Sequence, residues 1–233
     1  MTVARRLGSL DSSRQSDAST LKRGDAVNRR TRGPGARHEE RREQIADAVL
    51  AIVAGRGLQA VSQTEVAARA GVSAGRVQHY FPAKKELIEA AFDRANARST
   101  ARIRRLVGGD PLTAPPREAL TVVLTQLVPH DPETRTHLRV RQSFTALALS
   151  DEAIAGRMRA RYAEFHRELA VLVRRAQDAG AAPAGLDPRT AAVRLAALAE
   201  GLAYYVLIGI TEPEDAREQI LAAIADVHGE RPA

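Results

Sequence analysis

Residues 62–87 read SQTEVAARAGVSAGRVQHYFPAKKEL, and this stretch decides the fold of the N-terminal part of the chain. Ser62 and Glu65 have the spacing of a capping box, which predicts the start of a short helix. Gly71 predicts its end, because helices commonly end at a residue of positive φ. Ser73 predicts the N-cap of a second short helix. Two short helices joined by a glycine-containing turn are typical of a helix-turn-helix, whose second helix can enter a DNA major groove.

A longer stretch that contains this motif resembles a known family. Residues 45–88, IADAVLAIVAGRGLQAVSQTEVAARAGVSAGRVQHYFPAKKELI, are similar to the DNA-binding domain of the TetR family of one-component regulators. The matching elements are, in chain order, Gly57, Val66, Ala67, the AGVS of residues 70–73, Gly75, Tyr80, Phe81 and Lys84. Two positions depart from the family pattern. Gln63 stands where an apolar residue is usual, and Ile52-Val53 stand where Phe is common.

The resemblance implies an all-α protein with an N-terminal three-helix helix-turn-helix domain and a C-terminal helical bundle. Its three expected parts are a disordered basic arm (1–36), the DNA-binding domain (37–85) and an effector-binding and dimerisation domain (86–233). The implied function is ligand-responsive transcriptional regulation. A homodimer, most often a repressor, would bind a palindromic double-stranded DNA operator and be released by a small-molecule effector.

The composition is also that of a helical protein. Apolar residues make up 44% of the 233 residues but aromatic residues only 3%, so Leu, Val, Ile and Ala must fill the core. Alanine has the highest helix propensity, and no convincing period-two run predicts a strand. About nine helices are expected. Outside the quoted stretch they cover about 37–54, 84–107, 116–128, 132–149 and 151–179, a segment that begins at 188, and 213–228.

Nothing in the sequence indicates an enzyme, a metal site or a cofactor. The six His residues form no HExxH motif, and neither a Walker A motif nor GxSxG occurs. Cysteine is absent, which excludes disulfides and thiolate metal sites. The longest apolar stretch, Leu195–Ile210, contains Glu200 and is too short and too polar for a membrane span. With no early apolar run resembling a signal peptide, a cytoplasmic location without a membrane partner is expected.

Positive charge gathers at the N-terminal end of the chain. The net charge is +7, of which residues 1–36 carry +5, residues 37–85 carry +3 and the remainder −1. A polyanionic partner is therefore expected at that end. Residues 1–36 leave two interpretations open: a disordered or mis-annotated leader, or a basic arm whose Arg29, Arg30 and Arg32 reach into the minor groove.

The second helix of the motif is where DNA sequence would be read. Arg76 can donate two hydrogen bonds to a guanine edge, and Gln78 can pair with adenine. The resemblance implies that Tyr80 and Lys84 contact the phosphate backbone. The full predicted DNA-binding set is Ser62, Thr64, Ser73, Ala74, Gly75, Arg76, Gln78, His79, Tyr80 and Lys84. The alternative is an ordinary solvated helix face with Tyr80 packed on the preceding long helix.

Gly75 is the least expected member of this set. A glycine weakens a helix by about 1 kcal/mol relative to Ala. Its presence is explained if the backbone at this position closely approaches either DNA or the first long helix.

The C-terminal part provides candidates for effector binding and for dimerisation. The candidate effector contacts are Phe92, Asn96, Gln142, Phe144, Met158, Tyr162, Phe165, His166 and Tyr204, although each of them taken singly is better explained as a core residue. Arg139 and Arg141 could pair an anionic ligand, but a solvated helix face explains them better. The candidate dimer interface is Leu195, Leu198, Leu202, Tyr205, Ile220, Ile224 and Val227, and its alternative is that these side chains face only their own core.

Two other functions remain open from the sequence alone. One is a nonspecific architectural DNA-binding protein, and the other is a helical ligand-binding or catalytic bundle without DNA binding. The basic N-terminal third argues against the second. The sequence does not identify the effector, the operator, the target genes, or whether binding represses or activates.

Overall fold

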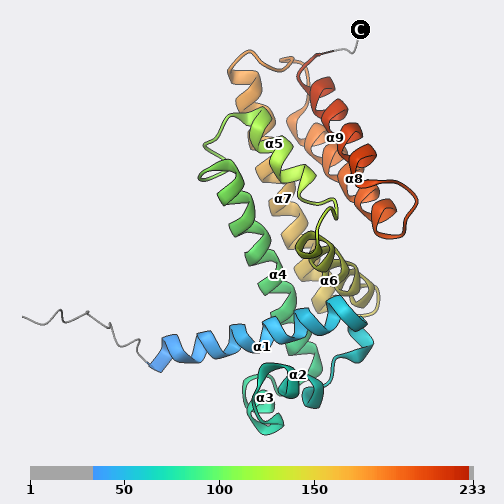
Figure 1. The fold of residues 1–233 in the computed structure, drawn as a ribbon. Coiled ribbons are helices and arrows are strands. Elements are labelled where there is room, and N and C mark those ends of the chain that lie inside the picture. Colours follow the sequence, from blue (N-terminus) through green and yellow to red (C-terminus); the bar gives the residue numbers. More distant parts are fainter. Residues whose placement is uncertain (1–33, 231–233) are drawn as a thin grey trace, which may run out of the picture.

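The computed structural model describes residues 34–230, and this part of the chain is entirely helical (Figure 1). The helices are α1 (Pro34–Arg56), a short 3-10 turn η1 (Leu58–Ala60), α2 (Gln63–Ala70), α3 (Ala74–Tyr80), α4 (Lys84–Val107), α5 (Pro116–Thr125), α6 (Pro132–Ala148), α7 (Glu152–Asp178), α8 (Pro188–Leu207) and α9 (Pro213–Val227). The predicted fold class and helix-turn-helix are confirmed.

Local sequence sets where several helices begin. The side chains of Asp131, Asp151 and Asp187 each accept a hydrogen bond from the backbone N–H three residues later, at the starts of α6, α7 and α8. A proline then occupies the first turn of α6 and α8, where its missing N–H costs nothing. These caps satisfy N–H groups that have no partner inside a helix.

Two apolar clusters form the interior, and α4 contacts both. The first joins α1, α2 and α3 to the first half of α4 and to parts of α6 and α7, with Val77 and Phe81 almost fully buried. The second joins α5, α7, α8 and α9, and Ile103 near the end of α4 packs against it. Figure 1 shows α4 running from the α1–α3 end of the molecule into the C-terminal bundle. Any shift of α4 would therefore change the packing of both clusters.

Two helix boundaries differ from the prediction. α1 begins at Pro34, so the end of the segment expected to be disordered is helical, while residues 1–33, including Arg29, Arg30 and Arg32, lie outside the described residues. α5 ends at Thr125 rather than near Val128. Val128 precedes Pro129, and a residue before proline is disfavoured in helical conformation. The chain instead closes with short turns from Leu127 and Val128.

α8 alone, among residues 34–230, is long and apolar enough to cross a membrane by length and composition. The prediction from sequence considers only the apolar stretch Leu195–Ile210, but α8 begins before it and has 20 residues, with a mean hydropathy of 1.3. Nine of its residues are nevertheless buried, and seven of these belong to the second cluster, which α8 forms with α5, α7 and α9. The packing is that of a core helix in a globular bundle.

Candidate DNA-binding surface and ligand cavity

The helices α2 and α3 have the predicted N-cap residues, and α2 has the predicted C-cap. Ser62 Oγ accepts from the N–H of Glu65 at 3.2 Å, and Ser73 Oγ accepts from the N–H of Arg76 at 3.2 Å. Gly71 ends α2 with φ of 65°. One half of the predicted capping box is wrong, because the Glu65 carboxylate pairs with Arg56 instead of returning to Ser62. That ion pair joins the end of α1 to α2.

α3 turns one residue inward and presents the others to solvent. Val77 is fully buried, whereas Arg76, Gln78 and His79 are exposed. The end of the helix is half-buried against α1, because the Tyr80 ring lies 4.7 Å from that of His38. The alternative interpretation, in which Tyr80 packs on α1, is therefore correct for part of this side chain. The remaining predicted DNA contacts, Ser62, Thr64, Ser73, Ala74, Gly75 and Lys84, are exposed in α2, α3, the turn between them and the start of α4.

Gly75 has no packing reason within the described chain. A Cβ atom placed on it would meet no atom within 4 Å, and its φ is not in the left-handed region. Close approach to α1, one of the two explanations considered for this glycine, is therefore wrong. Close approach to an external partner remains.

The hydrogen bonds of Gln63 explain why a polar side chain stands where the family pattern has an apolar one. Its Nε2 donates to the carbonyl oxygens of Pro82, at 3.2 Å, and of Phe81, at 3.4 Å. The side chain thus fastens the start of α2 to the turn between α3 and α4. Arg42 on α1 supports the same turn, with its guanidinium 4.5 Å above the Phe81 ring and one N–H donated to the Tyr80 carbonyl.

Ion pairs join α4 to α1 on one side. Arg94 contacts Asp47 at 2.9 Å and Glu43 at 3.0 Å, and Arg98 contacts Asp47 at 2.8 Å. The carboxylate of Asp47 therefore receives two guanidinium groups one helical turn apart on α4. This arrangement holds α1 against the first half of α4.

Ion pairs also join the start of α4 to the start of α7. Arg157 contacts Glu89 at 3.0 Å and Asp93 at 2.8 Å, and Lys85 contacts Asp151 at 2.6 Å. These contacts are largely exposed, so each contributes little on its own. Together they place α7 beside the residues that directly follow α3.

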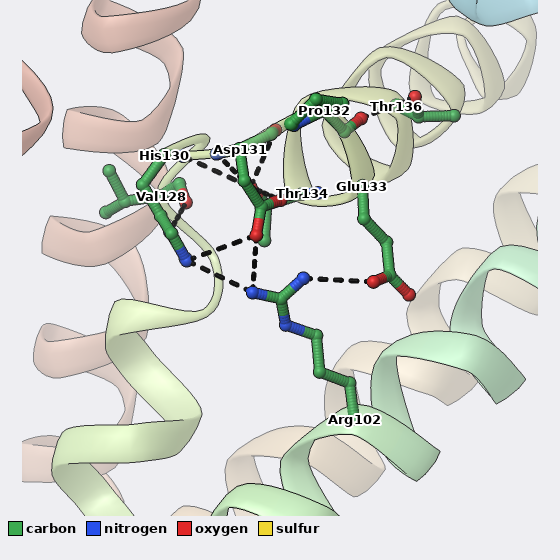
Figure 2. A network of polar contacts seen from close by, with 8 residues as sticks. All are labelled: Arg102, Val128, His130, Asp131, Pro132, Glu133, Thr134 and Thr136. Atoms are coloured by element: carbon green, nitrogen blue, oxygen red, sulfur yellow. Dashed lines mark hydrogen bonds and ion pairs between the residues drawn. The ribbon is translucent and has the colours of Figure 1, made fainter.

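A third connection joins α4 to the start of α6 (Figure 2). Arg102 donates to Asp131, the N-cap of α6, and to Glu133 at 3.0 Å. Burial opposes ionisation of Asp131, but hydrogen bonds from Thr134 and Arg102 outweigh it and lower its pKa to about 2. Asp131 is therefore a carboxylate at neutral pH, and it binds both the helix end and the guanidinium.

A cavity of about 220 Å³ lies between α4, α5, α6, α7 and α8. Five of the nine predicted effector contacts line it: Phe92, Asn96, Met158, Tyr162 and Phe165. The other four, Gln142, Phe144, His166 and Tyr204, do not. Phe144 is buried behind the wall, stacked on Phe92 with ring centres 4.0 Å apart. Tyr204 is 45% exposed on the outer face of α8.

The polar groups of the cavity are mostly ones that sequence reasoning missed. His137, Arg141 and Glu200 all line it. Arg141 Nη1 lies 3.4 Å from Glu200 Oε1, and the Tyr162 hydroxyl donates to Glu200 Oε2 at 3.0 Å. The interpretation of Arg141 as part of a solvated face is wrong, because the residue is only 8% exposed. Its position three residues before the apolar Phe144 was the available signal, since such residues share one helix face.

The neighbouring titratable groups are shifted toward their neutral forms. Burial, with the nearby Arg141 and Arg161, lowers the pKa of His137 to about 3. Its Nε2 lies 3.2 Å from Asn96 Oδ1, so the neutral ring donates its proton there. Burial and Glu200 raise the pKa of Tyr162 to about 12. At neutral pH, His137 and Tyr162 are therefore both uncharged.

The predicted dimer residues divide into two groups. Leu195, Leu202, Ile220 and Ile224 are buried in the chain's own second cluster, as the alternative interpretation describes. Leu198 and Val227 are half-buried, and Tyr205 is 47% exposed. Tyr204, Ile208 and Ile210, which are close to Tyr205 in sequence, are also exposed, as is Val193 near the start of α8. Val193, Ala197, Gly201, Tyr205 and Ile208 recur at steps of three and four and form an exposed apolar stripe along α8, which we call the α8 stripe.

Family models match both halves of the chain. Residues 45–91 match the model described as bacterial regulatory proteins, tetR family. Residues 116–229 match the model described as BetI-type transcriptional repressor, C-terminal. The two matches together include α2, α3 and the helices α5 to α9.

Individual relatives agree with these matches. A solved structure of a TetR-family regulator from Rhodococcus sp. is 32% identical, with a TM-score of 0.71, and the alignment covers 82% of this chain and 99% of that one. The HTH-type transcriptional regulator PksA of Bacillus subtilis is 35% identical over 48% of this chain, and the HTH-type transcriptional repressor KstR of Rhodococcus jostii is 36% identical over 38%. The chain spans 53% and 40% of the lengths of these two curated relatives.

Proposed function

Because the chain belongs to the TetR family of transcriptional regulators, we propose that it is a repressor that binds a palindromic DNA operator as a homodimer and leaves it when a small-molecule effector binds. The observation that carries the proposal is one continuous helix, α4, which begins directly after α3 and lines the cavity. Residues up to about 85 would form the DNA-binding domain, and the rest would bind effector and partner. The site of action is the cytoplasm, where the operator is.

DNA recognition is assigned to the exposed side of α3. Arg76 and Gln78 would read base edges, because both are exposed and carry donors suited to guanine and adenine. The caps at Ser62 and Ser73 leave exposed N–H groups near two helix starts, where a phosphate is favoured. His79, Tyr80 and Lys84 would hold the phosphate backbone and set the orientation of α3.

The switch is assigned to α4. Six residues of this helix line the cavity, and ion pairs hold the same helix to α1 and α7. An effector that favours one position of α4 would change the separation of the two α3 helices in a dimer. It shifts the balance only by its difference in affinity for the two states, and a tenfold difference corresponds to about 1.4 kcal/mol.

A second copy of the chain is assigned to the α8 stripe. The exposed Val193, Tyr205 and Ile208 form an apolar surface of the kind that marks protein–protein contacts. Half-buried Leu198 and Val227 are candidates for its edge. In a two-fold symmetric pair, each chain would present its α3 to one half of the operator, with half-sites about one DNA turn (~34 Å) apart.

The experiment that tests this function is selection of binding sites from a pool of random duplexes, followed by titration with competitor DNA. The proposal predicts an enriched inverted repeat. Arg76→Ala should relax preference at one position of each half-site, by about 1–3 kcal/mol. Lys84→Ala should weaken binding to all DNA sequences by the same factor. Uniform binding to every duplex would instead indicate an architectural DNA-binding protein, and no salt-dependent binding at all would indicate a bundle without DNA affinity.

A further inference from the structure

The cavity contains a guanidinium whose hydrogen-bonding capacity is not fully used. Nη2 of Arg141 is buried and has no hydrogen-bond partner among the described residues. Nη1 makes only the 3.4 Å contact with Glu200. A buried charged donor without a partner is unfavourable, so an acceptor brought into the cavity is favoured. Because Nη2 is itself buried, an acceptor would reach it only if the guanidinium turned away from its long contact with Glu200.

We propose that the effector is a small monoanion, a carboxylate with an apolar body, and that Arg141 binds its charged group. The inference rests on the proposed function, since it names the chemistry of the effector. A guanidinium suits this role because its N–H groups match the two oxygens of a carboxylate. The apolar body would lie against side chains from α4, from α7 and from the turn after α5: Phe92, Ile103, Leu127, Phe165, Leu169 and Leu172.

The charges in the cavity favour an anion over a cation. Three basic and three acidic residues line it, so their number decides nothing. Glu200 already accepts from Tyr162 and forms an ion pair with Arg141, Asp110 accepts from the N–H of Leu112, and Glu168 is exposed to solvent. A cationic ligand would have to compete for those oxygens. An anionic ligand would meet the unused donor of Arg141.

The size of the cavity limits the apolar body. A volume of about 220 Å³ is smaller than the roughly 300–1,000 Å³ of sites for drug-sized ligands. A carboxylate with a medium-length alkyl chain or with one aromatic ring fits this description. Such a ligand would touch Phe92 and Ile103 of α4, which connects its binding to the position of α3.

Three probes of equal chain length test the charge preference in the full-length protein by isothermal titration calorimetry: octanoate, octan-1-ol and octyltrimethylammonium. We expect octanoate to bind at least about tenfold more tightly than the other two. Arg141→Gln should remove that preference. Arg135→Gln should keep it, because Arg135 is on the same helix but does not line this cavity. Glu200→Gln should keep or strengthen octanoate binding, since it frees Arg141 from its ion pair.

The comparison among probes in the unmodified protein needs no variant, so it holds even if Arg141→Gln fails to fold. Equal binding of the three probes, tighter binding of the cation, or no binding of any of them would overturn the inference. Release of the selected operator is followed separately by fluorescence anisotropy. Octanoate that binds through Arg141 without releasing DNA would leave the carboxylate site standing and would contradict the proposed effector control. Selective operator binding without octanoate binding would contradict the carboxylate site and would leave the proposed DNA-binding function standing.

Discussion

For Gly75, the structure excludes one of two possible explanations, close approach to α1. This glycine lies inside the recognition helix α3, where glycine is unfavourable, yet nothing in the described chain approaches it. Arg141 shows a similar contrast, since a charged group is placed in an apolar interior with one donor unused. Both residues lower the stability of the isolated protein by themselves. The proposals above give each of them a partner from outside the chain, DNA for Gly75 and a ligand for Arg141.

Gly75→Ala is therefore expected to separate stability from DNA binding. The added methyl group meets open space, so the variant should be more stable than the wild type by about 0.5–1 kcal/mol in urea unfolding. Its affinity for the operator should fall, because a Cβ would stand where the backbone approaches the duplex. Gly71→Ala is the control, and should lose about 1–2 kcal/mol because φ there is 65°. Undiminished operator affinity in Gly75→Ala would remove the explanation given for this glycine.

His137 is expected to make the protein sensitive to mild acid. Its pKa of about 3 in the folded state lies below the ordinary 6.5, so the unfolded chain takes up a proton first as the pH falls. Stability from this source is complete above pH 6.5 and is lost as the pH drops, by about 2 kcal/mol at pH 5.

The measurement for His137 is urea unfolding at pH 7 and pH 5. His137→Gln should show about 2 kcal/mol less acid destabilisation than the wild type. His166→Gln, on α7 and outside the cavity, should behave like the wild type. A His137→Gln protein that loses as much stability as the wild type would contradict burial of a neutral ring.

At the scale of the elements, α4 is fastened along its whole length. Lys85 and Glu89 hold its start to α7, Arg94 and Arg98 hold its middle to α1, and Arg102 holds its far part to α6. The cavity opens on the same helix. Under the proposed function, ligand binding in the cavity and the orientation of α3 both depend on the position of this one helix.

Arg102→Met tests the connection between α4 and α6. It removes the partners of Asp131 and Glu133 at a largely buried position, so the expected loss at pH 7 is about 1–3 kcal/mol in urea unfolding. Asp131, with its lowered pKa, contributes stability that is present above pH 4 and lost as the pH falls toward 2. The variant should therefore lose less stability than the wild type between pH 4 and pH 2. Arg105→Met, an exposed neighbour on α4, serves as the control, and equal loss in both would contradict the role of Arg102.

The features predicted correctly from sequence are those that depend on neighbouring residues. Asp131, Asp151 and Asp187 each act on an N–H three residues away, so their helix starts could be placed. Whether an apolar helix side faces its own core, a cavity or a partner depends on helices far away in sequence. The predictions for Leu195, Ile220 and Phe144 placed these residues at an interface or in the cavity for this reason, whereas the structure places them in the core. Arg141 was assigned to a solvated face because its actual environment comes from α7 and α8, which are distant in sequence.

At the scale of the whole molecule, the candidate DNA-binding helices and the α8 stripe lie in different parts of the fold. α2 and α3 lie at one end, and α8 and α9 lie at the side of the C-terminal bundle (Figure 1). The α8 stripe leaves aromatic and branched apolar side chains in contact with solvent in a single chain. A second copy would cover them and fix the distance between two α3 helices.

Tyr205→Glu is expected to weaken self-association. A charge placed in the middle of an apolar interface loses its hydration, so we expect at least a tenfold rise in the dimer dissociation constant, or about 1.4 kcal/mol. Sedimentation equilibrium measures this directly. Val171→Glu changes an equally exposed apolar side chain on α7 and should leave association unaltered. Equal dimerisation of the Tyr205→Glu and wild-type proteins would place the interface elsewhere.

The central claim is that two chains together present two α3 helices to one duplex, and the spacing of the half-sites tests it most directly. Binding of the full-length protein to the selected inverted repeat is compared with binding to the same duplex carrying five extra base pairs at its centre. Five base pairs turn one half-site by about half a helical turn, since a turn takes about 10–10.5 base pairs. The account predicts two chains per original duplex, and affinity for the altered duplex no greater than for random DNA. One chain per duplex, or equal affinity for both duplexes, would contradict it.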